Sequence, residues 1–261
     1  MTDIDHTLYC SETDSIHPEN IKALQQLKDA GIPVIFASSR TMYGTKLTAA
    51  ETGIISGNNY LISDTGALIY RCRDQRIIFE HAFDPEDVRT LYLMSREYGF
   101  TFNIPQDSYV LSNGYSEILN YDFSSVRMDI RLVHDLLSAI EKPVYRVSVS
   151  SRSKPMASFR PLLEKQFGDR YNFHCSQDVV IDIAPKLVDK LSALKIILNE
   201  LNIDLSETAA IGDGGNDACM LESAGLSAAV ANACEDAKKA AGMITADDRD
   251  GGVAEFIRSF L

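Results

Sequence analysis

The sequence lacks several features that would place it in other classes of protein. Its 261 residues include 25 lysines and arginines against 37 aspartates and glutamates, which gives a net charge of −12. Without a basic tract, this charge repels nucleic acid and anionic membranes, so we expect neither as a partner. No apolar run is long enough to cross a bilayer, and the first residues have no signal-peptide pattern. We therefore expect a cytoplasmic protein that is a monomer or a weak homo-oligomer.

Cysteine is scarce and has no pattern of zinc or disulfide sites. The five cysteines are Cys10, Cys72, Cys175, Cys219 and Cys234. They are odd in number, widely scattered and without C-x-x-C spacing, so we expect reduced thiols. The composition, with 45% hydrophobic and 24% charged residues, is that of a globular protein of one large or two ordinary domains.

Acids and glycines are concentrated near the C-terminus, in Gly212-Asp213-Gly214-Gly215-Asn216-Asp217. The apolar run 208–211 before them predicts a buried strand, and 217–221 predicts the start of a helix. The acids would then lie at the C-terminal end of a strand, where open α/β sheets bind their ligands. Such a segment suits a metal-dependent site, although a Gly/Asn/Asp cluster is also often only a turn with an N-cap.

A second acidic pair, Asp3 and Asp5, lies at the other end of the chain. In an extended segment both side chains point to the same side, which suits a divalent cation and one reacting group. If Asp3 is held at a strand end, its carboxylate could attack phosphorus while Asp5 gives or takes the proton of the leaving oxygen. The alternative is a solvated acidic N-terminus.

Two further segments place polar groups at the ends of predicted elements. Ser38 and Ser39 follow a predicted strand at 32–37, where hydroxyl and N–H groups can hold a phosphate oxygen, although serines there are also plain caps. Lys190 lies in the first turn of a helix that Asp189 is expected to cap. A cation there opposes the helix dipole, which hints at function, whereas a solvated surface lysine is the ordinary alternative.

The order of predicted elements indicates two domains. The outer parts, 1–78 and 183–261, alternate short apolar strands with helices, which predicts an α/β core with a doubly wound, Rossmann-like parallel sheet. Residues 79–182 carry strands of antiparallel type and helices expected at 85–98, 131–140 and 155–167. This middle part is predicted to be an inserted α+β domain.

In these motifs and their order, the chain resembles the haloacid dehalogenase superfamily of phosphohydrolases, in particular the Cof-type branch with a C2B α/β cap. The segment from Asp3 to Leu8 is similar to the family's Asp-x-Asp-x-Thr motif, and Ser38-Ser39-Arg40 to its Thr/Ser-Gly-Arg motif. The segment from Pro185 to Lys190 is similar to its lysine motif, and Gly212 to Asp217 to its Gly-Asp-x-x-Asn-Asp motif. The resemblance covers nearly the whole chain.

The resemblance implies a role for each matching residue. Asp3 would be the nucleophile that forms an aspartyl-phosphate and would also ligate Mg²⁺. Asp5 would be the general acid/base and a metal ligand through its backbone carbonyl, with Asp213 as the third protein ligand and Asp217 supporting the metal shell. The phosphoryl oxygens would be held by Ser38, the Ser39 backbone, Lys190 and Asn216.

The same resemblance implies a Mg²⁺-dependent phosphatase that hydrolyses small phosphorylated metabolites, in particular sugar phosphates. Residues 79–182 would form a cap that closes over the site and selects the substrate. The resemblance does not name the cap residues that contact the leaving group; Asn103 and Arg146 are candidates only as polar residues of the cap, and a surface position is the more ordinary alternative for each. The rival is a regulatory relative that binds a phosphate or metabolite without turnover. A receiver-type switch that is phosphorylated on an aspartate is a more distant rival, because a large cap would serve no purpose in such a protein.

The chain departs from the family pattern at two places. His6 stands where the family usually has glycine, from which we expect altered access or rate. Only Met1 and Thr2 precede Asp3, where the family has a run of apolar residues that forms the central strand. A missing strand would leave its neighbours with unpaired backbone groups. We consider three explanations for the short segment before Asp3. The natural protein could start upstream, added residues could fill the gap, or the first motif could be loosely held, with low activity.

Overall fold

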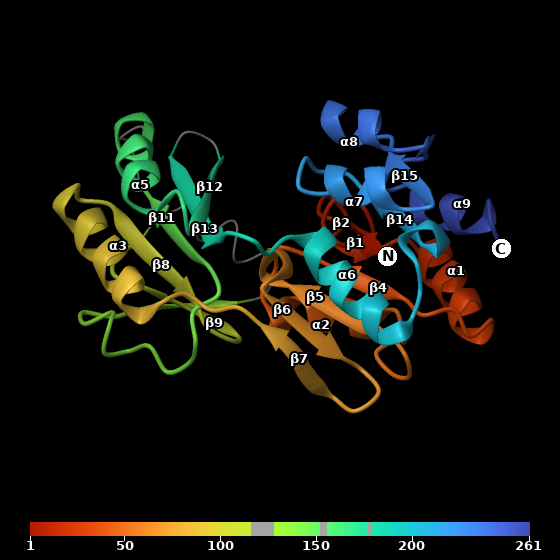
Figure 1. Cartoon of the computed structure of the whole chain (residues 1–261), viewed down its shortest axis with the longest axis horizontal. Coiled ribbons are helices and arrows are strands. Elements are labelled where there is room, and N and C mark those ends of the chain that lie inside the picture. Colours follow the sequence, from red (N-terminus) through yellow and green to blue (C-terminus); the bar gives the residue numbers. More distant parts are fainter. Residues whose placement is uncertain (116–127, 152–155, 177–178) are drawn as a thin grey trace. The chain divides into compact units, whose positions relative to one another are not determined.

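The computed structural model describes residues 1–115, 128–151, 156–176 and 179–261 (Figure 1). They form two compact units, one of Met1–Phe79 with Asp189–Leu261 and one of Glu80–Val188. The return at residue 183 that the sequence indicated falls inside a strand, β13 (Val180–Pro185). Because β13 keeps its pairing with the second unit's sheet through Pro185, the chain returns to the first unit only after Val188.

The first unit is built on an eight-stranded sheet with the order β16-β15-β14-β1-β4-β5-β6-β7. The strands of this sheet are β1 (Thr2–Asp3), β4 (Ile35–Ala37), β5 (Tyr60–Ser63), β6 (Leu68–Arg71), β7 (Arg76–Glu80), β14 (Ala209–Gly212), β15 (Leu226–Val230) and β16 (Met243–Thr245). From β16 to β5 all neighbours are parallel, and β6 returns antiparallel to β5. The short strands β2 (Tyr9–Cys10) and β3 (Ser15–Ile16) pair separately.

Helices connect these strands, as expected for parallel neighbours. They are α1 (Pro18–Asp29), α2 (Met42–Glu51), α6 (Lys190–Leu201), α7 (Ala218–Ser223), α8 (Glu235–Ala240) and α9 (Gly252–Arg258), with single 3₁₀ turns at Asp64–Gly66 and Leu205–Glu207. The predicted doubly wound α/β core is confirmed. Among the described residues, no helix has the length and apolar character needed to cross a membrane.

Apolar side chains cover both faces of this sheet. In β4, Ile35 and Ala37 pack with the apolar side of α6, whereas Phe36 belongs to the cluster to which α1 and α9 contribute. Since successive side chains of a strand point to opposite faces, this division shows that helices bury the strand from both sides.

The second unit has a six-stranded sheet with the order β10-β9-β8-β11-β13-β12. The strands besides β13 are β8 (Thr101–Pro105), β9 (Tyr109–Ser112), β10 (Asp129–Leu132), β11 (Val147–Ser150) and β12 (Tyr171–Ser176), and the helices are α3 (Pro85–Glu97) and α5 (Arg160–Phe167), with a 3₁₀ turn at Met156–Ser158. Only β10 and β9 are a parallel pair among those described. The predicted α+β character is therefore present.

The helix predicted at 131–140 is wrong. Residues 129–132 form strand β10 beside β9, and turns follow it. Pairing with β9 holds this segment in the strand conformation. A side-chain contact adds to it, since the Arg131 guanidinium lies 3.5 Å from the centre of the Tyr109 ring of β9. Leu136 is buried without a helix, so its apolar spacing misled the prediction. The helix predicted at 155–167 begins with a residue outside the described part and is helical from Arg160.

Candidate active site

Asp3 is held in the middle of the sheet although its strand has two residues. Thr2 lies opposite both Ile211 of β14 and Phe36 of β4, and Asp3 lies opposite Ala37. After Asp3 the chain turns at once, with the N–H groups of Leu8 and Tyr9 donating to the carbonyl of Ile4 at 3.0 and 2.8 Å. This fixes the Asp3 carboxylate at the carboxyl end of β1, where it is 5% exposed.

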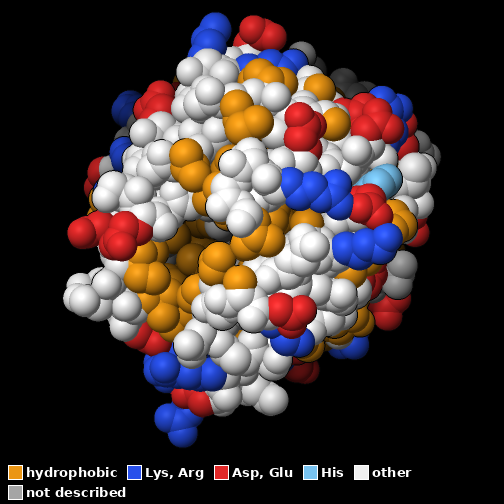
Figure 2. Space-filling view, turned by 90° about the vertical axis from the view of Figure 1, so that its right-hand side faces the viewer, with side chains coloured by type: hydrophobic (Ala, Val, Ile, Leu, Met, Phe, Trp, Pro, Cys, Tyr) orange, Lys and Arg blue, Asp and Glu red, His pale blue; other side chains and the backbone are white. Residues whose placement is uncertain are grey.

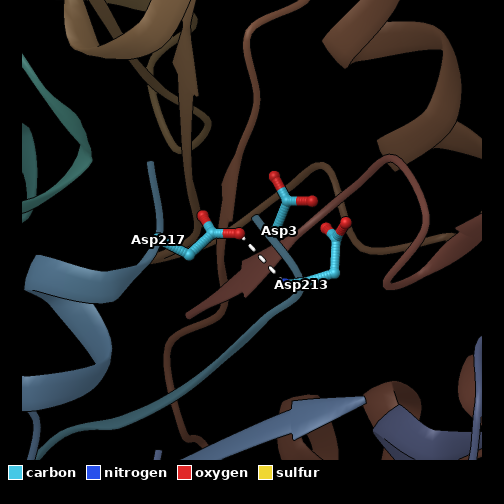
Figure 3. Close-up of side chains that lie close together, drawn as sticks. All are labelled: Asp3, Asp213 and Asp217. Atoms are coloured by element: carbon cyan, nitrogen blue, oxygen red, sulfur yellow. Dashed lines mark hydrogen bonds between the residues drawn. The ribbon is translucent and has the colours of Figure 1, made fainter. Parts of the chain in front are cut away.

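Asp213 and Asp217 follow β14, the neighbour of β1. Asp217 is buried, and its Oδ2 accepts from the backbone N–H groups of Asp213 and Gly214 at 3.0 and 2.9 Å. A Cβ atom at Gly212 would lie 2.6 Å from the Asp217 carboxylate, so only glycine fits there. Figure 3 shows how this turn brings the two carboxylates next to that of Asp3.

Lys190 joins the acids from the start of α6. Asp189 caps this helix, as predicted from the sequence, and the structure adds a capping box with Ser192. The Lys190 ammonium group is 1% exposed and donates to Oδ1 of Asp217 at 2.6 Å and to Oδ1 of Asp3. The lysine is therefore not a surface residue, and two carboxylates offset its unfavourable place in the helix dipole.

The charges of this cluster are strongly coupled. The pKa of the Asp3 carboxyl lies well above its usual value. Burial is the main cause and the charge of Asp217 adds to it, whereas the charge of Lys190 acts in the opposite direction. Burial and Asp217 also raise the pKa of Asp213, against a 3.0 Å hydrogen bond from the Thr7 hydroxyl. Burial disfavours the charged form of Lys190, but Asp3 and Asp217 outweigh it and raise the pKa of the ammonium group.

Asp5 lies apart from this cluster. Its carboxylate accepts from Arg40 in a two-pronged arrangement, with Nε 2.9 Å from Oδ2 and Nη2 2.5 Å from Oδ1. Arg40 is nearly buried, donates to Thr48 at 2.8 Å, and lies over the Tyr9 ring at 4.7 Å. The Asp5 side chain is thus oriented by the buried guanidinium of Arg40.

The phosphate-binding candidates lie on the loops around these acids. Ser38 is buried after β4; its hydroxyl accepts from the Arg40 N–H at 3.0 Å and lies 3.5 Å from Asp5 Oδ2. The side-chain amide of Asn216 donates to the Ser39 hydroxyl at 3.4 Å, which links the two loops. The structure therefore brings Ser38, Ser39 and Asn216 together around the acids, and their roles toward phosphate stay predictions.

Sequence reasoning assigned no role to several supporting residues. Arg40 was part of a recognised motif, yet only the structure reveals its contact with Asp5. In the turn Asp64–Gly66, the backbone N–H of Asp64 donates to the carbonyl of Arg40, and the backbone N–H of Thr65 donates to the carbonyl of Ser38. Gly66 has φ +109°, and any Cβ there would collide with the carbonyl of Asp189 beside Lys190. A Gly in an Asp-Thr-Gly turn was a signal that could have pointed to such a close approach.

The donor set fits a divalent cation. Asp3, Asp213 and Asp217 each offer a carboxylate oxygen, and these oxygens lie within 4.8 Å of one another; among the described residues no other such group occurs. Three carboxylates against the one ammonium of Lys190 leave an excess of negative charge when all are ionised. Oxygen ligands of this kind are those that Mg²⁺ and Ca²⁺ prefer. The side chain of Asp5 is not part of this group.

Acids and a buried lysine at the carboxyl end of a doubly wound sheet define an α/β enzyme with an acidic, metal-compatible site. The chain matches the family of haloacid dehalogenase-like hydrolases over residues 1–257. It therefore belongs to the haloacid dehalogenase-like hydrolases, and the resemblance to their Cof-type branch is confirmed.

Individual relatives match over almost their whole length. The phosphoglycolate phosphatase of Methanopyrus kandleri is 28% identical over 269 residues, which cover 100% of this chain and 96% of the relative. Phosphatase YwpJ of Bacillus subtilis is 28% identical over 290 residues, which cover 99% and 98%. A haloacid dehalogenase-like hydrolase from Bacteroides thetaiotaomicron has a crystal structure with a TM-score of 0.91, 26% identity, and coverage of 100% and 98%.

Proposed function

We propose that this hydrolase is a Mg²⁺-dependent phosphatase that acts on small phosphorylated metabolites through an aspartyl-phosphate. The observation that carries the proposal is the convergence of Asp3, Asp213, Asp217 and Lys190 at one buried point, although they come from opposite ends of the chain. The relatives named as phosphatases support the same chemistry.

Each group has a role in this reaction. The Asp3 carboxylate attacks phosphorus and displaces the leaving oxygen, to which Asp5 delivers a proton; Asp5 then takes a proton from the water that hydrolyses the aspartyl-phosphate. Mg²⁺, held by Asp3, Asp213, Asp217 and the Asp5 carbonyl, would supply positive charge to the phosphoryl oxygens when bound. Lys190 supplies a further positive charge, and Ser38, the Ser39 N–H and Asn216 supply hydrogen bonds.

The second unit carries a row of polar side chains buried within its sheet. The row crosses four neighbouring strands: Asn103 lies opposite Ser112 and Ser148, and Ser148 lies opposite Asp182. The Asn103 amide donates to the Ser148 carbonyl and the Ser150 hydroxyl, each at 3.2 Å, and these side chains are buried. We propose that the second unit selects the substrate and favours sugar phosphates, and that the hydrogen bonds of this buried row hold the strands of the unit in position.

The test is phosphate release from a panel of sugar and small-metabolite phosphates. The parent should turn over at least one substrate with Mg²⁺ and none with EDTA, and Asp3→Asn should lose the activity. Asp29→Asn, which changes an exposed carboxyl at the end of α1, is the matched control and should keep it. Equal residual rates in Asp3→Asn and the parent would instead favour the relative that binds without turnover.

The substrate-selecting unit has its own test. Asn103→Ala should change the relative kcat/KM among sugar phosphates, because the strands of the substrate-selecting unit lose the hydrogen bonds to Ser148 and Ser150. Thr90→Ala, a polar change on α3 of the same unit, should leave the preference unchanged. An unaltered preference in Asn103→Ala would remove the row from substrate selection without touching the proposed phosphatase chemistry.

A further inference from the structure

A cavity of about 930 Å³ lies within the second unit, bordered by α3 and the segment 134–144. Every residue that lines it falls between Ala82 and Val144, so the cavity belongs to this unit alone. Its most buried lining side chains are apolar or aromatic: Phe83, Val88, Tyr92 and Val144. The volume is typical of sites for small molecules, which measure about 300–1,000 Å³.

Tyr92 brings one polar group to this apolar lining. The residue is 5% exposed, and its ring meets the Phe102 ring edge to face, with 5.7 Å between the ring centres. Within the described parts of the chain, the Tyr92 hydroxyl has no hydrogen-bond partner. Because buried tyrosine hydroxyls ordinarily have one, an acceptor atom of a ligand would complete the site.

Two arginines of α3 stand on either side of Tyr92. Arg89 precedes it by three residues and Arg96 follows it by four, which places all three side chains on one face of the helix. The Arg96 guanidinium lies 5.6 Å from the centre of the Tyr92 ring. Both arginines are exposed and line the cavity, and neither forms an ion pair with a described residue. They therefore offer positive charge beside an apolar surface.

The other charged side chains of the lining leave this charge largely in place. Lys142 is already paired with Asp107 at 2.9 Å, and Asp135 accepts from the N–H and hydroxyl of Ser138 at 3.2 and 2.7 Å. Glu86 stands in the first turn of α3, about 15 Å along the helix axis from the second arginine. The cavity is thus acidic at one end of α3 and basic along the rest.

A cavity in the first unit lacks this basic character. It measures about 450 Å³, and its opening appears in Figure 2 as a hollow bordered by hydrophobic side chains. Of the described residues that line it, Glu207 is the only one with a charged side chain. An anionic ligand with an apolar body therefore fits the cavity of the second unit better than this one.

We propose that the cavity beside α3 binds a small amphipathic anion, with a flat apolar body and one carboxylate or phosphate group. The body packs on Val88 and the Tyr92 ring. The anionic group lies near the Tyr92 hydroxyl, within reach of the long side chains of Arg89 and Arg96, whose planar guanidinium groups suit both kinds of anion. A neutral apolar molecule would leave these donors without an acceptor.

The test uses two fluorescent probes of the same ring system, anilinonaphthalene sulfonate and the neutral phenylnaphthylamine. The double variant Arg89→Gln/Arg96→Gln should raise the Kd of the sulfonate about tenfold or more and leave that of the neutral probe unchanged. Lys165→Gln, which removes an exposed cation from α5 of the same unit, should bind both probes as the parent does. Tyr92→Phe should raise the Kd of the sulfonate about threefold without lowering the urea midpoint, since the hydroxyl loses no protein partner.

Hydrogen exchange and competition locate the bound probe and identify its anionic group. The sulfonate should slow amide exchange in α3 and leave α1 and α9, which line the cavity of the first unit, unchanged. Naphthoate or naphthyl phosphate, each added with EDTA, should displace it, and the one with the lower Kd names the preferred group. The proposal is overturned by equal sulfonate Kd values in Arg89→Gln/Arg96→Gln and Lys165→Gln, by protection confined to α1 and α9, or by displacement with neither competitor.

Discussion

Replacing Lys190 with methionine tests the buried charge cluster directly. Methionine has a similar length and no charge, so the helix keeps its shape while Asp3 and Asp217 lose their shared partner. Lys190 Nζ bonds both carboxylates, and all three side chains are 8% exposed or less. Water therefore cannot replace the lost contacts.

The expected effect is large. Removing one partner of a buried ion pair costs about 3–5 kcal/mol, because the remaining charge stays desolvated. A loss of this size is a substantial part of the 5–15 kcal/mol that stabilises an ordinary protein. With an m-value of about 3 kcal/mol per M, it lowers the urea midpoint by about 1 M or more. Phosphate release should fall by about a hundredfold or more, since one positive charge is lost at the phosphoryl oxygens.

The assay is urea unfolding followed by circular dichroism, with and without Mg²⁺. Lys195→Met is the matched control, because Lys195 lies on the same helix but is exposed; it should behave as the parent. Mg²⁺ should raise the midpoint of Lys190→Met more than that of the parent, since a bound cation replaces the missing charge. A Lys190→Met midpoint equal to that of Lys195→Met without Mg²⁺ would refute the coupling described here.

Three further predictions concern the surroundings of the site. Arg40→Lys loses the two-pronged contact with Asp5 and should lower kcat about tenfold with little change in KM; an unchanged kcat would mean that Arg40 does not position Asp5. His6 has φ +58°, a left-handed conformation that costs most residues about 1–2 kcal/mol, so His6→Gly should be neutral or stabilise by up to about 1 kcal/mol in urea unfolding, and a clear loss would contradict it. Burial raises the pKa of Cys72 to about 11, so iodoacetamide at pH 8 should alkylate exposed Cys219 in the folded protein but Cys72 only after unfolding, as mass spectrometry of digests would show.

The pattern of short-range signals predicted much of the fold. Alternating apolar strands and helices predicted the doubly wound core, and Asp189 marked the start of α6 because a cap depends on residues within one turn. The acids beside Gly212 marked the site for a similar local reason, since only glycine leaves room for the Asp217 carboxylate. The segment 129–132 was mispredicted because its strand depends on pairing with β9, which no local spacing reveals.

Sequence alone determined which residue types stand at the ends of which elements, and the resemblance to a known superfamily grouped Asp3, Asp213 and Lys190 in one predicted site. Only the tertiary structure decided how they meet. The Lys190 ammonium could have faced solvent, and its place between Asp3 and Asp217 results from packing α6 onto the sheet. Arg40 reaches Asp5 for the same reason. Such contacts join residues far apart in the chain, so their geometry follows from the packed sheet and not from local sequence preferences.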